Sequence, residues 1–144
     1  MRLSIASALT LSSLAAASIQ AATPEPALPS GFVCSIAGAY KLSRTGIIES
    51  AGAKPASGTV TIDTRSGVVA GDAINASLWS WRLIQPIDAR TGAKLLGTSN
   101  NDVAELSVMT DQPTTRESTT WYPFVFLSAG RGSLVSGLCR GAHD

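Results

Sequence analysis

Histidine is nearly absent from this chain of 144 residues: the only one is His143, next to the last residue. Histidine is the usual base in nucleophilic catalysis. A side chain at a frayed terminus is not held with the accuracy that catalysis demands. This argues against Ser–His–Asp and Cys–His chemistry and against a histidine-based metal site. We therefore expect no enzyme activity, no catalytic residue, no metal and no cofactor.

Long apolar runs are also scarce, apart from one at the N-terminus. Arg2 precedes an uncharged stretch, Leu3 to Ile19, rich in Ala, Leu and Ser, and small residues follow at Ala21 and Ala22. This layout predicts a secretory signal peptide over residues 1–22. The run is too short and too diluted by Ser and Thr for a membrane span. Residues 23–30 carry three prolines and are expected to form a mobile extended lead.

Net charge is absent from the predicted mature chain as well. The whole chain has 11 Lys and Arg against 10 Asp and Glu, and the signal peptide contains one of the basic residues, Arg2. Proteins bind nucleic acids and anionic membranes through an excess of clustered basic residues, and the near-zero net charge gives no sign of such an excess. We expect a single domain over residues 31–144, without a membrane span, that is monomeric and secreted or periplasmic.

Cysteine occurs twice, as Cys34 and Cys139. Two cysteines in an exported chain form a disulfide by default. Closing a loop of about 100 residues contributes up to about 4.7 kcal/mol in the chain-entropy model. No histidine or second thiol lies at metal spacing from either cysteine, so a disulfide is favoured over a metal site.

A sustained helical period is missing beyond residue 22, whereas alternating apolar and polar residues recur between turn signals. Val60 and Ile62 share a face, as do Ala104, Leu106 and Val108. Strand candidates are residues 32–42, 57–63, 68–72, 76–84, 95–97, 103–110, 121–127 and 133–139, with 47–48 as a short extension. Residues 49–55, 85–94 and 111–120 are interpreted as loops. The pattern predicts an all-β antiparallel barrel or sandwich, a meander of about seven or eight strands, closed by the disulfide.

The first strand candidate carries two further expectations. Its residues expected to be buried are Val33, Cys34, Ile36, Tyr40 and Leu42. Gly38, in the middle of this segment, suggests a β-bulge or a close approach of another backbone.

Aromatic residues and carboxylates are the remaining chemical signals. Six of the eight aromatics cluster on two strands and either pack the core or line a binding surface. The binding candidates are Trp79, Trp81, Trp121 and Tyr122, of which Trp79 and Trp121 are expected to be exposed. Paired carboxylates can hydrolyse glycosides, and the candidates are Glu49, Asp63, Asp72, Asp88, Asp102, Glu105, Asp111 and Glu117. Most of these lie beside turn residues. Asn75 begins a glycosylation sequon.

The chain resembles small exported bacterial proteins of unknown function. The resemblance lies in Cys34, in the segment from Val60 to Gly71 with its Asp63, Ser66 and Gly67, and in the terminal Pro123-Phe124-Val125-Phe126 and Gly137-Leu138-Cys139. The segment Cys34-Ser35-Ile36-Ala37-Gly38 and the later Gly137-Leu138-Cys139 are also similar to avidin- and lipocalin-like small barrels. Neither resemblance implies biotin binding or any other activity.

Three functional hypotheses remain open. The first is a non-catalytic protein-interaction module, an inhibitor or host-directed factor, that binds through residues 85–94 and 111–120. The second is a carrier of a small apolar ligand inside a calycin-like barrel, suggested by the aromatic cluster. The third is a carbohydrate-active enzyme that uses two carboxylates.

Overall fold

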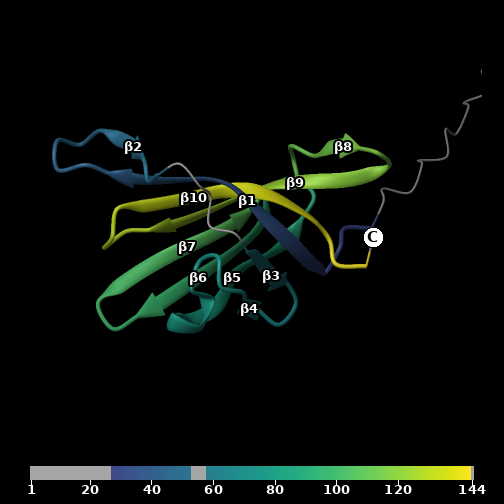
Figure 1. Cartoon of the computed structure of the whole chain (residues 1–144). Helices are drawn as coiled ribbons and strands as arrows, with labels where there is room; N and C mark the ends of the chain where they lie inside the picture. The colour runs from purple at the N-terminus through teal and green to yellow at the C-terminus, as the bar shows by residue number, and fades with distance from the viewer. Residues whose placement is uncertain (1–26, 53–57, 144) are drawn as a thin grey trace, which may run out of the picture.

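The computed structural model describes residues 27–52 and 58–143 and is all-β, as predicted. Figure 1 shows its elements, which are β1 (Gly31–Leu42), β2 (Ile48–Ser50), β3 (Thr59–Asp63), β4 (Val69–Ala70), the 3-10 turn η1 (Ala76–Leu78), β5 (Ser80–Asp88), β6 (Gly92–Ser99), β7 (Asp102–Val108), β8 (Thr114–Arg116), β9 (Thr119–Ser128) and β10 (Ser133–Gly141). Every described strand pair is antiparallel.

The described strands form one sheet in the order β4-β3-β1-β10-β9-β7-β6-β5, which curls into a nearly closed eight-strand barrel. The tip of the β3–β4 hairpin approaches β5 across the seam. A Cβ atom placed on Gly67 would lie 3.1 Å from the backbone nitrogen of Leu83. Two short strands extend the sheet: β2 pairs with β1, and β8 pairs with β9. They lie at opposite ends of the β1–β10–β9 ribbon (Figure 1).

The first and last long strands are neighbours, and the predicted disulfide joins them. Cys34 of β1 lies directly opposite Cys139 of β10, and the two are disulfide-bonded. Both residues are fully buried. The disulfide therefore links the first and last long strands within the core, as the sequence predicted, at neighbouring strands inside the sheet and away from the barrel's seam.

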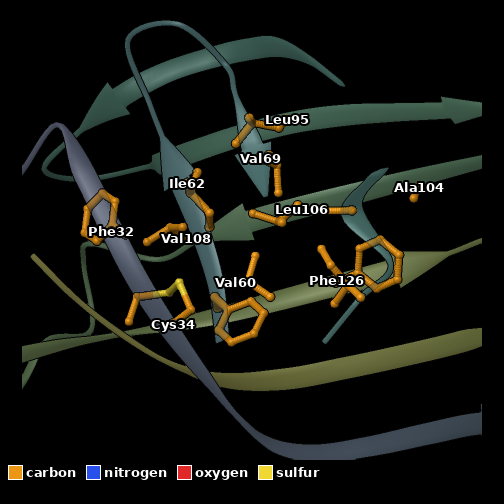
Figure 2. Packing of buried hydrophobic residues seen from close by; sticks show 14 of the residues in the cluster. Phe32, Cys34, Val60, Ile62, Val69, Leu95, Ala104, Leu106, Val108 and Phe126 are labelled. Carbon is orange, nitrogen blue, oxygen red and sulfur yellow. A yellow bond between two sulfur atoms is a disulfide. The ribbon is translucent and has the colours of Figure 1, made fainter. Parts of the chain in front are cut away.

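The barrel interior is filled by one cluster of apolar side chains. Val60 and Ile62, and likewise Leu106 and Val108, alternate inward as predicted. Figure 2 shows side chains from β1, β3, β7 and β9 pointing toward one another, with the disulfide of Cys34 among them. Burial of this cluster removes apolar surface from water, which is the main favourable contribution to folding.

The predicted inward face of β1 is only partly correct. Cys34 is buried, but Tyr40 and Leu42 are 38% and 55% exposed. The register against β10 shifts between Ile36 and Gly38, so that Ala37 is an extra residue. Such a bulge breaks strict alternation, and side chains beyond it change face. Gly38 therefore marks a bulge, as expected, and its consequence is that the end of β1 points its apolar residues outward.

Two predicted loops contain strands. Residues 85–88 belong to β5 and 92–94 to β6, and residues 114–116 form β8. Pro86 suggested a loop, but β5 ends the sheet order and its register with β6 shifts between Gln85 and Asp88, so Pro86 has no partner residue in the ladder. Part of the loop assigned to 49–55 is also strand, since β2 includes Glu49 and Ser50. Residues 53–57 lie outside the described residues.

The predicted signal peptide, residues 1–22, lies outside the described residues, as do residues 23–26 of the proline-rich lead. The end of the lead contacts the barrel. Leu28 packs against the apolar cluster, and the carbonyl oxygen of Ser30 accepts hydrogen bonds from the backbone N–H and the hydroxyl of Thr64, each at 2.9 Å. The chain is therefore attached to the barrel before β1 begins.

Candidate functional site

Trp79 and Trp81, two of the four predicted binding residues, pack inside the barrel. Trp79 is only 8% exposed, so the expectation that it lies on the surface is wrong. Its ring contacts Phe126 edge-on, with centroids 5.8 Å apart. The indole N–H of Trp81 donates to the carbonyl oxygen of Ala76 at 3.0 Å. Trp79 directly follows the 3-10 turn η1 with extended backbone, and it shares the inward face of Trp81 and Leu83.

The other two predicted residues are neighbours in β9 and face opposite ways. Tyr122 is 8% exposed and packs edge-on against Phe32, with ring centroids 5.6 Å apart. Trp121 points outward and is half-buried. Of the four aromatic candidates, the structure places Trp121 in a surface hollow and packs Trp79 and Tyr122 in the core.

The hollow beside Trp121 lies beneath the β8–β9 hairpin and has a volume of about 340 Å³. We call it the Trp121 groove. Its lining combines one aromatic ring, one aliphatic side chain, two hydroxyls and two charges, from Ser35, Arg116, Glu117, Thr119, Trp121 and Leu138. Strands β1, β8, β9 and β10 and the turn after β8 thus bring together residues that are distant in sequence.

A second surface feature lies at the other end of the same ribbon. Tyr40 of β1 is opposite Leu134 of β10, Leu134 is opposite Leu127 of β9, and Leu42 is opposite Ile48 of β2. These five side chains border a hollow of about 260 Å³, and we call them the apolar patch. Leu42, Ile48 and Leu127 are 55%, 66% and 45% exposed.

Sequence reasoning missed the apolar patch, since it treated Tyr40 and Leu42 as core residues. The bulge at Ala37 reverses their direction. One signal was present: Ile47 and Ile48 follow the Thr45-Gly46 turn in a segment without other core candidates. The patch depends on pairing between β1, β2, β9 and β10, which the local pattern does not define.

Two of the candidate carboxylates, Asp63 and Asp88, cap turns. A carboxylate oxygen of Asp63 accepts from the backbone N–H groups of Arg65 and Ser66. Asp88 does the same for Arg90 and Thr91. These hydrogen bonds, led by the one from Arg65 for Asp63 and the one from Arg90 for Asp88, lower the pKa of both carboxyls. A general acid in glycoside hydrolysis needs the opposite shift.

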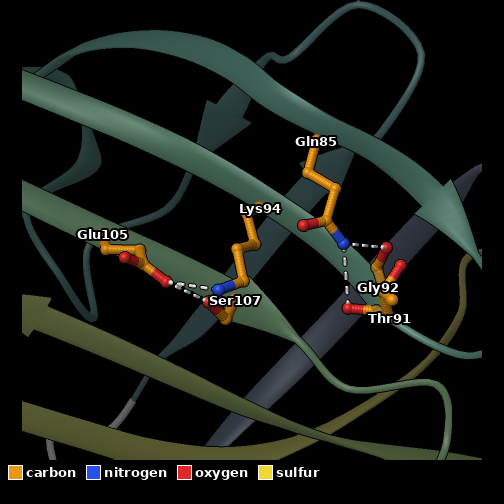
Figure 3. A network of polar contacts seen from close by, with 6 residues as sticks. All are labelled: Gln85, Thr91, Gly92, Lys94, Glu105 and Ser107. Carbon is orange, nitrogen blue, oxygen red and sulfur yellow. Dashed lines mark hydrogen bonds and ion pairs between the residues drawn. The ribbon is translucent and has the colours of Figure 1, made fainter.

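Glu105 belongs to a polar network on the outside of the barrel (Figure 3). Its carboxylate accepts from the hydroxyl of Ser107 at 2.8 Å and lies 3.4 Å from the ammonium of Lys94. Nearby, the side-chain amide of Gln85 donates to the carbonyl oxygens of Thr91 and Gly92. These contacts cross-link β5, β6 and β7 on their outer face, as expected for Glu105.

Asp102 joins the ends of three strands. One carboxylate oxygen accepts from the backbone N–H groups of Val103 and Gly130 at 2.8 and 2.6 Å. The other accepts from the hydroxyl of Ser128 at 2.5 Å, and the guanidinium of Arg131 lies 3.7 Å away. The hydrogen bond from Ser128, followed by the backbone bonds, lowers the pKa of Asp102.

This arrangement predicts an acid-dependent loss of stability. A carboxyl whose folded-state pKa lies below its unfolded value stabilises the fold above about pH 3.8. That contribution is lost as pH falls through the folded-state pKa. We expect Asp102→Asn to lower the urea midpoint at neutral pH, and the difference from wild type to shrink in acid. Asp111→Asn, on an exposed side chain, should leave the midpoint unchanged; an equal Asp102→Asn effect at both pH values would contradict the assignment.

The remaining sequence features add no further site among residues 27–52 and 58–143. The structure contains no group of three or more His, Cys, Asp or Glu residues there that could hold a metal ion. The same residues include no helix with the length and apolar content needed to cross a membrane. Asn75 of the sequon is exposed.

Comparison with protein families, curated proteins and solved structures finds no match to this chain.

Proposed function

We propose that the protein is an exported, non-catalytic binding module that docks a protein partner on the apolar patch. The observation that carries the proposal is the gathering of exposed apolar side chains around one hollow, with Leu42, Ile48 and Leu127 each about half exposed or more. Contiguous exposed apolar surface is characteristic of protein interaction sites. Of the other exposed apolar residues, Ile84 lies on β5, Val103 on β7 and Leu78 in η1, away from the hollow.

The position of the patch also supports docking. Three of its strands, β1, β10 and β9, are long neighbours in the sheet, and the disulfide also joins β1 to β10, so the surface is built on rigid elements. Lys41 lines the same hollow beside the apolar side chains. An apolar centre with charged groups at its border is the usual composition of an interface.

Export is part of the same proposal, and its support is the disulfide. Disulfides form and persist mainly in oxidising compartments outside the cytosol. The predicted signal peptide at residues 1–22 agrees with this location.

A carrier function is less well supported than surface binding. Phe32, Leu95, Leu106 and Phe124 are each at most 1% exposed, and they belong to one continuous cluster. An apolar ligand in the barrel would have to displace these side chains. We therefore place the binding surface outside the barrel.

Site-specific photo-crosslinking tests the proposed docking surface. A photoreactive residue at position 127 should capture one protein repeatedly in the native surroundings. The matched control is position 84, because Leu127 and Ile84 are 45% and 46% exposed on different strands. Leu42→Glu should abolish the crosslink at position 127. The free energy of unfolding, measured in urea, should change by no more than about 0.5 kcal/mol. Equal capture from positions 127 and 84, or none from either, would refute the proposal.

A further inference from the structure

The Trp121 groove lies at the opposite end of the β1–β10–β9 ribbon from the apolar patch. Trp121 is opposite Arg140 of β10 and Thr114 of β8, whereas the patch lies near Leu127 and Leu134. The groove has a mixed lining in place of an apolar one. It is therefore a separate feature, and its occupant need not be the partner of the patch.

The floor of the groove is formed by Trp121 and Leu138. The indole of Trp121 is half-buried on the outer face, and its N–H makes no hydrogen bond with any residue in the described part of the chain. Buried Trp N–H groups normally find partners, as that of Trp81 does. An indole that keeps an open ring surface and an unused donor offers a stacking platform with one polar end.

The rim of the groove supplies donors and acceptors, most of which the fold leaves unused. Arg116 and Glu117 are exposed, and neither forms an ion pair with another residue within the two described segments. Thr119 adds a hydroxyl group, and the hydroxyl of Ser35, which donates to the carbonyl oxygen of Leu138 at 3.5 Å, can still accept. The rim therefore presents a guanidinium, a carboxylate and two hydroxyls, which can both donate to and accept from a ligand.

The β8–β9 turn holds these groups over the floor. Arg116 pairs with Thr119, so Glu117 and Ser118 form a two-residue connection. Both have positive φ, 48° and 68°, which is the conformation of the hairpin turns that match strand twist. The turn fixes the direction in which Arg116 and Glu117 leave the strand ends beside Trp121.

We propose that the Trp121 groove binds a neutral hexopyranose unit of a β-linked glycan. One face of such a ring carries only C–H groups and can stack on the indole, while its equatorial hydroxyls both donate and accept hydrogen bonds. Glu117 beside Arg116 balances the local charge, so a phosphate or another anion would meet a carboxylate. An apolar ligand would leave the polar groups of Arg116, Glu117 and Thr119 without partners, which costs free energy.

Titration with cellohexaose and chitohexaose tests this site. We expect at least one of them to bind with a Kd on the order of 1 mM, because an open groove leaves much of a sugar in water. Saturation-transfer difference NMR should show the ring C–H protons in contact with the protein. Trp121→Ala should weaken binding at least about tenfold, and Arg116→Ala or Glu117→Gln about fivefold, the effect of one hydrogen bond.

Two control variants test whether loss of sugar binding is specific to the Trp121 groove and independent of the apolar patch. Thr114→Ala, across from Trp121 but outside the groove lining, should bind the sugars as wild type does. Leu42→Glu, which removes docking on the apolar patch, should also leave sugar binding intact. The proposal is overturned if neither sugar binds at about 10 mM, if Trp121→Ala binds equally well, or if inorganic phosphate or a peptide occupies the groove instead.

Discussion

Replacing Cys34 and Cys139 together by alanine is expected to lower the free energy of unfolding by about 4 kcal/mol. The disulfide closes a loop with a sequence separation of 105 residues, and opening this loop gives the unfolded chain more conformations. A domain of this size is stable by only about 5–15 kcal/mol. Urea unfolding followed by tryptophan fluorescence should show a much lower midpoint. The slope should rise, since the uncrosslinked unfolded chain exposes more surface.

A chemical control distinguishes loop opening from lost packing. Both cysteines are fully buried, so alanine also removes sulfur atoms from the core. Wild-type protein refolded in the presence of a reductant keeps the side chains but not the bond. It should lose most of the same free energy. If reduced wild type were as stable as oxidised protein, the disulfide would contribute little, and the alanine effect would reflect packing alone.

The architecture could be predicted from the sequence because its signals are local residue patterns or follow from the number of cysteines. Alternation at Val60 and Ile62 and at Leu106 and Val108 defines inward faces directly. Two cysteines near opposite ends of the domain leave only one intramolecular pairing, and that pairing predicts neighbouring first and last strands. Both inferences are confirmed.

The errors arise where pairing overrides the local pattern. Pro86 is acceptable in β5 because of that strand's place at the end of the sheet, which the sequence alone does not define. Trp79 was expected at the surface because it lies at a strand end, but it shares the inward face of Trp81 and Leu83. The bulge at Ala37 could be suspected from Gly38, yet its outcome, an outward Tyr40, required the register with β10.

The same reasoning explains how much of the candidate surfaces was predictable. Trp121 could be named because an aromatic residue at the start of an apolar strand is conspicuous. Arg116 and Ser35 could not, since β8 and β1 meet around the groove only through β9 and β10. Surface sites on a barrel are assembled across strands, whereas sequence periodicity describes one strand at a time.

Gly137→Ala is expected to destabilise the protein by about 3 kcal/mol or more. Gly137 of β10 lies opposite Ile36, beside the bulge, and opposite Phe124 of β9. A Cβ atom there would overlap the carbonyl oxygen of Ser35 and lie 2.5 Å from the Phe124 ring. Backbone atoms cannot rotate away, so β1 and β10 would have to separate. The urea midpoint measures the loss.

Gly31→Ala is the matched control, because the same change there brings the new methyl group no closer than 3.3 Å to the side chain of Ala142. Its effect should stay within about 0.5 kcal/mol. The disulfide lies two residues from Gly137 and holds β1 against β10. Gly137→Ala should therefore cost less in the Cys34→Ala, Cys139→Ala background, where the strands can move apart. An equal cost in both backgrounds would mean that the disulfide does not limit this relaxation.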